Sequence, residues 1–231
     1  MADKENILPA TVFLELRRRL IPVLLSFVVG FGVGIIFYKQ ILLFLLSLFD
    51  LKGINIVMTS SYQMFDLAFN VGIVLGLVIL LPVFIYEFYF FVKPALRIKE
   101  RKLFNKIIPF SMFLFVAGFW FGIKMTQYIF SFFSQTTADF HLGNYLDVSK
   151  MISQVLAMGL LTGLVFQIPL VISALMRMGI VKKEFLVEKR KIVWVILLII
   201  AVLLPSTDVL SLVMITVPLV LLFELTLLLN K

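Results

Sequence analysis

Cysteine is absent from this 231-residue chain, and histidine occurs once, at His141. Without cysteine the chain has no disulfide, no thiol nucleophile and no thiolate-bound metal. A single histidine, in a stretch expected to be a polar loop, excludes a histidine-based triad or metal site. The GxSxG, HExxH and P-loop patterns are missing too, and these would indicate a hydrolase, a zinc protease or a nucleotide site. We therefore expect no catalysis, no cofactor and no metal.

Charged residues are also scarce, at 15% of the chain, whereas 62% of the residues are hydrophobic and the mean hydropathy is +1.12. Soluble domains have about 45–50% apolar residues, so the composition predicts an integral membrane protein. The net charge of +8 arises from short basic clusters between apolar runs. Attraction to lipid headgroups explains such clusters, and we expect the lipid bilayer as surroundings and no nucleic acid partner.

The apolar runs predict a single all-α transmembrane domain with six spans. These are expected at about 21–38, 64–92, 107–133, 151–176, 192–204 and 209–229. The first run is longer than the apolar part of a signal peptide and lacks a small-residue cleavage pattern, so we expect it to be a retained helix. The fifth run has 13 residues before Pro205, which cover about 20 Å against a hydrocarbon core of about 30 Å. We therefore expect short fifth and sixth helices, with a thinned bilayer or a recessed outer turn.

The orientation follows from the positions of the basic residues. Of the 21 Lys and Arg residues, 17 fall before the first span, in the stretches 93–106 and 177–191, or at Lys231. The other four lie in or beside the alternate connections: Lys39, Lys52, Lys124 and Lys150. Basic loops resist translocation, so this sorting predicts that both termini are cytoplasmic. We expect the membrane to be a cell (inner or plasma) membrane. The stretch 177–191 is expected to form a short amphipathic helix on that side.

Polar side chains within the spans are the next candidates, because burying one in lipid is costly. Glu87 and Glu224 lie near the inner ends of their spans, where an interfacial position suffices. Asp208 precedes the last span and is expected to cap it. Gln167 is well inside the fourth span and cannot reach the interface. Its amide is expected to form hydrogen bonds either within this chain or with a partner helix, and both alternatives stay open.

Three glycines, Gly30, Gly32 and Gly34, fall within the first span. Small residues let membrane helices approach closely, so they predict a packing surface on this helix. Glycine is also tolerated in lipid without any such role, and the sequence does not separate the two interpretations.

Two glutamates stand within the basic clusters. Glu15 precedes Arg17-Arg18-Arg19, and Glu100 lies in the stretch 93–106. At helical spacing Glu15 would form a solvated ion pair with Arg18 or Arg19, worth a few tenths of a kcal/mol. Alternatively, the two carboxylates face one groove, which would suit guanidinium groups because arginine binds carboxylates through paired N–H bonds.

These residues resemble the TatC family, the polytopic receptor subunit of the twin-arginine protein translocase. The family begins with His-Leu-x-Glu-Leu-Arg-x-Arg-Leu, whose second half matches Glu15 to Leu20. Its first cytoplasmic loop reads Phe-x-x-Pro-Ala/Gly-Leu-x-x-x-Glu-Arg/Lys, matched in order by Phe91, Pro94, Ala95, Leu96, Glu100 and Arg101. Further counterparts along the chain are Pro82, Val83, Tyr86, Phe166, Pro169, Asp208, Pro218 and Glu224.

Three positions depart from the family pattern. Val12 stands where the family usually has its N-terminal histidine, and Thr207 precedes Asp208 where proline is typical. Gln167 replaces a glutamate that is common in the fourth span. An amide carries no charge at that depth, although it still forms interhelical hydrogen bonds.

The resemblance implies a receptor that binds the Arg-Arg pair of signal peptides on folded cargo proteins. The positions implied for peptide binding are Glu15, Leu16, Arg17, Phe91, Pro94 and Glu100. It also implies self-association and single-span TatA/TatB-type partners, with Phe166, Gln167, Pro169 and Asp208 as contact positions. Transport in the family is driven by the proton-motive force. The alternative is a small secondary transporter or channel, for which inverted repeats and charged groups at the midplane would be expected.

Overall fold

The computed structural model describes residues 7–48, 55–57, 60, 62–92, 98–139, 145–205 and 208–229. Side chains are described in these ranges except at 7–14, 55–57, 92, 98–107, 137–139 and 145–146. Helices make up most of the chain: α1 (Ile7–Ile36), α2 (Tyr38–Ser47), α3 (Gln63–Val92), α4 (Ile98–Asp139), α5 (Val148–Val165), α6 (Ile168–Arg177), α7 (Lys183–Glu188), α8 (Arg190–Val202) and α9 (Val209–Leu229). The expected all-α class is therefore confirmed.

Five segments of the described chain are long and apolar enough to cross a membrane. They are Glu15–Ile36, Gln63–Phe91, Ile108–Thr136, Val148–Arg177 and Val209–Leu229. Their outward faces are apolar: Leu24, Val28 and Val29 of α1 are each about 60% exposed. An apolar surface of this extent is what contact with lipid requires. The short α8 has 13 residues, so a sixth crossing stays a prediction.

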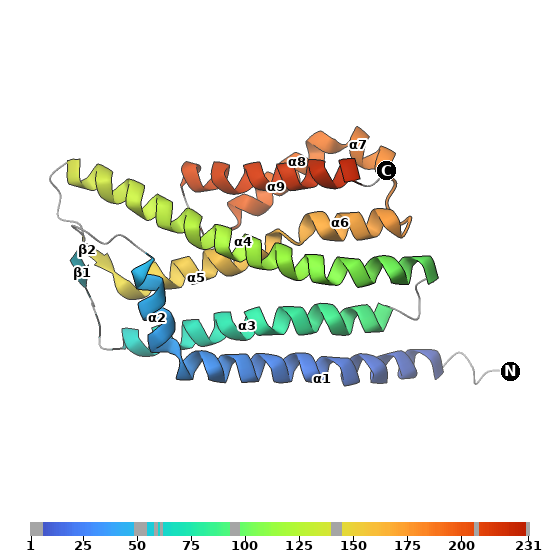
Figure 1. Cartoon of the computed structure of the whole chain (residues 1–231), viewed down its shortest axis with the longest axis horizontal. Helices are drawn as coiled ribbons and strands as arrows, with labels where there is room; N and C mark the ends of the chain where they lie inside the picture. The colour runs from blue at the N-terminus through green and yellow to red at the C-terminus, as the bar shows by residue number, and fades with distance from the viewer. Residues whose placement is uncertain are drawn as a thin grey trace.

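Helix α1 packs antiparallel along α3, at the bottom of Figure 1. Two glycine pairs bring the backbones together. A Cβ on Gly30 would lie 2.8 Å from Gly76 Cα, and one on Gly34 would lie 2.6 Å from Gly72 Cα. Gly32 has open space around it. The predicted packing role is therefore confirmed for Gly30 and Gly34, whereas Gly32 is merely tolerated.

Helices α4 and α5 occupy the middle of the molecule, with α6, α8 and α9 on the side away from α1 (Figure 1). The predicted fourth span, 151–176, is interrupted: α5 ends at Val165 and α6 begins at Ile168. Pro169 lacks the N–H that would bond the carbonyl of Val165, and this explains the break. Helix α9 packs its buried face, which includes Ile215, Leu219 and Phe223, into this half of the core.

The connections hold more structure than their sequences suggested. The stretch 93–106 was expected to be a loop, but α4 begins at Ile98 and continues through it. Lysine, arginine and glutamate are good helix formers, so the helix runs past the apolar span. Strands β1 (Asn55–Val57) and β2 (Tyr145–Asp147) form a parallel pair that was not expected. Helix α7 occurs where a short amphipathic helix was predicted.

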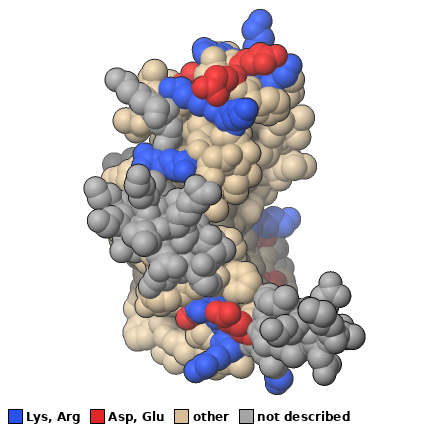
Figure 2. All heavy atoms as spheres, turned by 90° about the vertical axis from the view of Figure 1, so that its right-hand side faces the viewer, with Lys and Arg blue, Asp and Glu red and all other residues tan. Residues whose placement is uncertain are grey.

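The two ends of the molecule differ (Figure 1). The start of α1, the end of α3, α7 and the end of α9 lie at one end, and α2, β1 and β2 lie at the other. Helix α9 begins well short of the end that α4 reaches. Of the two helices expected to be short, α8 is short at 13 residues, whereas α9 has 21 residues and is long enough to cross a membrane. Figure 2 looks onto the first of these ends, where Lys and Arg side chains gather at the top and bottom with Asp and Glu beside them.

Candidate functional site

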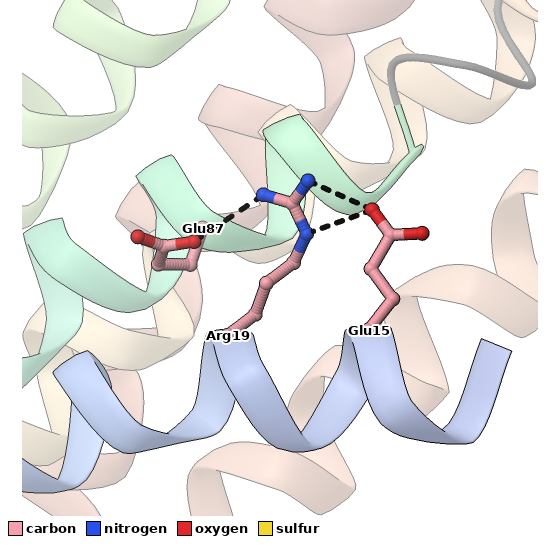
Figure 3. Close-up of polar contacts among 3 residues, drawn as sticks. All are labelled: Glu15, Arg19 and Glu87. Atoms are coloured by element: carbon pink, nitrogen blue, oxygen red, sulfur yellow. Dashed lines mark hydrogen bonds and ion pairs between the residues drawn. The ribbon is translucent and has the colours of Figure 1, made fainter. Parts of the chain in front are cut away.

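Glu15 and Arg19 lie one turn apart on α1, four residues from each other, so their side chains share a face of the helix. Arg19 donates two hydrogen bonds to the same oxygen of Glu15, Oε1, from Nε at 3.2 Å and from Nη2 at 2.8 Å. Of the two partners considered for Glu15, Arg18 and Arg19, the structure selects Arg19. In Figure 3 the second oxygen of Glu15 points away from the guanidinium.

The third member of the site, Glu87, comes from α3. Arg19 Nη1 donates to Glu87 Oε2 at 3.4 Å, so the guanidinium lies between two carboxylates (Figure 3). Arg19 precedes Gly30 by eleven residues, and Glu87 follows Gly76 by eleven. Eleven residues are about three helical turns, so equal steps along antiparallel helices keep the same faces opposed. The glycine contact thus sets the register that places Arg19 opposite Glu87.

These side chains surround an open pocket of about 660 Å³ lined by Glu15, Arg18, Arg19, Pro22 and Glu87. Glu15 is 45% exposed, whereas Arg19 and Glu87 are 25% and 22% exposed. Solvent screens ion pairs at such exposure, so each contributes about 0.2–1 kcal/mol to folding. The lining brings two carboxylates and two guanidinium groups together, and carboxylates are acceptors that guanidinium groups bind strongly.

The sequence-predicted peptide site is partly within the described chain. Glu15, Leu16 and Arg17 are exposed on α1, and Phe91 is half-buried in the last turn of α3. Pro94 lies outside the described residues. Glu100 lies near the start of α4, and its side chain is outside the described set. The proposed pairing of Glu15 with Glu100 in one groove therefore stays a prediction.

Sequence reasoning missed Glu87 as a member of this site and treated it as interfacial. The spacing from the glycine pairs is the signal that would have found it. That signal requires knowing that Gly30 packs against Gly76, and this is a property of the folded helix pair.

Gln167 lies at the break between α5 and α6, and its amide bonds to α4 and α5. Its Oε1 accepts from Ser111 Oγ at 2.5 Å, and its Nε2 donates to the carbonyls of Ser111 and Gly163 at 3.3 and 3.4 Å. Of the two alternatives left open, the hydrogen bond within this chain is present. The break turns the side chain toward α4.

The other expected partner-contact residues also point inward or to their own helix. Phe166 is 6% exposed and packs against Phe121 at 5.7 Å between ring centroids, and Pro169 is buried. Asp208 accepts from the backbone N–H and the hydroxyl of Ser211, each at 2.7 Å, which confirms its expected capping role. A partner contact at these residues stays a prediction, and burial means that Phe166 and Pro169 would act by shaping the surface.

Glu224 is hydrogen-bonded across the short helical hairpin. Trp194 Nε1 on α8 donates to Glu224 Oε1 on α9 at 3.1 Å. The carboxylate was expected only at the interface, and the structure adds that it ties the two helices together.

Comparison with known proteins gives one family. The model of the family described as Sec-independent protein translocase protein (TatC) matches residues 11–218. The protein TatCy of Bacillus subtilis is 32% identical over 94% of this chain and 86% of its own length. TatC of Listeria innocua is 30% identical over 92% of this chain and 86% of its own.

Solved structures agree with the sequence relatives. A crystal structure of the twin-arginine translocase receptor TatC superposes with a TM-score of 0.80 at 29% identity, covering 95% of this chain and 98% of that one. A second, determined in the detergent DDM, has a TM-score of 0.83 at 28% identity and covers 95% and 99%. The likeness therefore extends over nearly the full length of both chains.

Proposed function

Because this chain belongs to the TatC family of Sec-independent protein translocase proteins, we propose that its α1 pocket binds the arginine pair of twin-arginine signal peptides. The chain is a receptor subunit of the Tat translocase, an integral membrane component of protein export. The peptides would be carried by folded cargo proteins and would arrive at the cytoplasmic face. Glu15 and Glu100 would bind the guanidinium groups, with Leu16, Arg17, Phe91 and Pro94 around them.

A single observation carries this proposal: the Glu15 carboxylate already binds a guanidinium, that of Arg19, in an open pocket. A carboxylate that binds the guanidinium of Arg19 has the charge and the hydrogen-bond acceptors that a peptide arginine would use in its place. Basic residues elsewhere on this end of the molecule would repel the peptide, so recognition depends on the acids among them.

Partnership with other Tat components follows from the family, and we propose that TatA/TatB-type single-span proteins are these partners. Their contact region would be the surface around the α5–α6 break and the start of α9, where Phe166, Gln167, Pro169 and Asp208 lie. Self-association in a receptor complex is part of the same proposal. The supporting feature is the exposed apolar surface of α9, which includes Val213, Val217 and Leu221.

We further propose six membrane crossings with both termini cytoplasmic, in a cell membrane. The five long apolar segments would be joined by α8 as the sixth. Its 13 residues cover about 20 Å of a core of about 30 Å, so the bilayer would thin there or the outer turn would be recessed.

The peptide-binding proposal is tested by titrating a labelled twin-arginine signal peptide against the detergent-solubilised protein. We expect Glu15→Gln and Glu100→Gln each to weaken binding about tenfold or more, because a charge-assisted hydrogen bond is lost. A Lys-Lys peptide should bind the unchanged protein more weakly, since lysine lacks the planar fork of donors. Glu184→Gln in α7 removes the same charge from an exposed position and serves as the control. If Glu15→Gln binds no more weakly than this control, the α1 pocket is not the peptide site.

A further inference from the structure

Arg19 occupies the carboxylate that a peptide arginine would use. Both of its bonds to Glu15 go to Oε1, at 3.2 and 2.8 Å. An arginine ligand binds a carboxylate best through two parallel N–H bonds, one to each oxygen. Arg19 and a peptide arginine therefore compete for Glu15, because a paired contact needs the oxygen that Arg19 holds.

Glu87 offers Arg19 a second acceptor. The contact between Arg19 Nη1 and Glu87 Oε2 is 3.4 Å long, against 2.8 Å for the shortest contact with Glu15. Arg19 is thus held mainly by Glu15, with Glu87 within reach of a small side-chain movement. The glycine contact between α1 and α3 sets the position of Glu87 relative to Arg19. It is also less exposed than Glu15, at 22% against 45%, so Glu15 is the carboxylate that faces an incoming ligand.

We propose that Arg19 is an internal occupant of the signal-peptide site, and that Glu87 receives Arg19 when a peptide guanidinium takes Glu15. The inference rests on the proposed role of Glu15 in peptide binding. In the empty site the guanidinium of Arg19 keeps Glu15 paired. On peptide binding Arg19 transfers its hydrogen bonds to Glu87, so no charge is left unpaired in the partly buried pocket. Glu87 is a positioning residue in this exchange and acts on the peptide through Arg19.

The exchange means that every ligand must displace Arg19 from Glu15 before it binds this carboxylate. A ligand must replace the bonds that Arg19 makes with Glu15, and a guanidinium makes equivalent ones. A lysine ammonium is a compact point charge and does not reproduce the planar pair of bonds. Internal occupancy therefore lowers the affinity for every ligand by the same displacement cost, and the preference for arginine over lysine comes from the paired bonds that Glu15 accepts from a guanidinium.

The direct test compares Arg19→Gln with Arg18→Gln in the peptide titration. Both variants remove one positive charge from the lining of the same pocket, so both reduce repulsion of the cationic peptide. Arg19→Gln additionally frees Glu15. Because a partly exposed ion pair contributes little, we expect Arg19→Gln to bind about twofold to fivefold more tightly than Arg18→Gln. Thermal unfolding in the same detergent confirms that both variants are folded.

The role of Glu87 is tested in two backgrounds. With Arg19 present, Glu87→Gln removes the alternative acceptor, and peptide binding is expected to weaken about threefold. With Arg19→Gln the same change is expected to have less than about a twofold effect, because no guanidinium needs to be received. An equal loss in both backgrounds would mean that Glu87 binds the peptide directly, and would overturn the exchange.

Failure of this inference is distinguishable from failure of the peptide site itself. If Glu15→Gln weakens binding but Arg19→Gln binds no more tightly than Arg18→Gln, the site stands and internal occupancy is wrong. If Glu15→Gln has no effect, the proposed site fails and the inference fails with it.

Discussion

Single side chains in this molecule have roles that depend on partners far away in the chain. Gln167 illustrates this, because its amide bonds to Ser111 across 56 residues of sequence. Its depth in an apolar span showed that it needed hydrogen bonds, but the sequence left open where they would come from. The packing of α4 against the α5–α6 break supplies them. The neutral amide also makes these bonds without placing a charge in the apolar region.

Ser111 and Gln167 are expected to be energetically coupled. In a double-mutant cycle of Ser111→Ala and Gln167→Leu, the coupling in the free energy of unfolding should be about 0.6–1.7 kcal/mol, as for hydrogen bonds between membrane helices. Denaturant unfolding in mixed micelles measures it. The control is Ser26→Ala, whose hydroxyl donates to Val23 of its own helix. That variant combined with Gln167→Leu should be additive, and additivity in the Ser111 cycle too would refute the coupling.

The sequence predicted side-chain contacts within one helix better than contacts between residues far apart in the chain. Asp208 was expected to cap the last helix, and it does so at Ser211, three residues away. A local ion pair with Arg18 or Arg19 was one of the two alternatives for Glu15, and Glu15 pairs with Arg19 at one helical turn. Contacts of this short range follow from helical spacing alone. The contact of Arg19 with Glu87, separated by 68 residues, does not.

Pairs of helices carry the next level of organisation, and the α1–α3 pair is the most informative. Gly30 and Gly34 meet Gly76 and Gly72, so the two backbones touch at two successive turns. This contact fixes the register of the pair, and the register brings Arg19 to Glu87. The geometry of the pocket is therefore set by glycines some three turns away.

Alanine substitutions are expected to distinguish a glycine that packs against α3 from one that has open space around it. Gly34→Ala should lower the free energy of unfolding by about 1–3 kcal/mol, because its Cβ would overpack the contact with α3. Gly32→Ala, in the same helix but with open space around it, should be neutral or stabilise by up to about 1 kcal/mol. Thermal or denaturant unfolding in one detergent compares them. Equal effects of the two substitutions would contradict the glycine contact as the origin of the register.

The limits of the helices were largely readable from the sequence, and the exceptions have physical causes. Long apolar runs predicted α3 and α9 to within a residue or so at each end. The beginning of α4 was missed because a charged helix leaving the bilayer looks like a basic loop. The parallel pairing of β1 and β2 was missed because it joins two three-residue strands nearly ninety residues apart. Such short strands carry little pattern, and their pairing joins segments far apart in the chain.

The arrangement of the full bundle places the site at the end where most of the described basic residues lie. The start of α1, which carries the pocket residues Glu15 and Arg19, lies at the same end of the bundle as the end of α3, α7 and the end of α9 (Figure 1). Lys and Arg side chains gather at that end (Figure 2). The opposite end carries α2 and the two strands, and the described basic residues on that side are Lys39, Lys124 and Lys150. If the first end is cytoplasmic, the pocket faces the compartment in which folded cargo is made. The charge asymmetry and the proposed receptor role therefore require the same orientation.

That orientation can be measured directly. The chain has no cysteine, so a variant with one introduced cysteine carries a single thiol. Ser47→Cys at the end of α2 and Glu188→Cys at the end of α7 place exposed thiols at opposite ends of the bundle. With a membrane-impermeant maleimide, we expect Ser47→Cys to be labelled in intact cells and Glu188→Cys only after permeabilisation. The unchanged chain gives the background. The reverse pattern would invert the topology and place the pocket on the outer face. That result would contradict the proposed binding of cytoplasmic signal peptides.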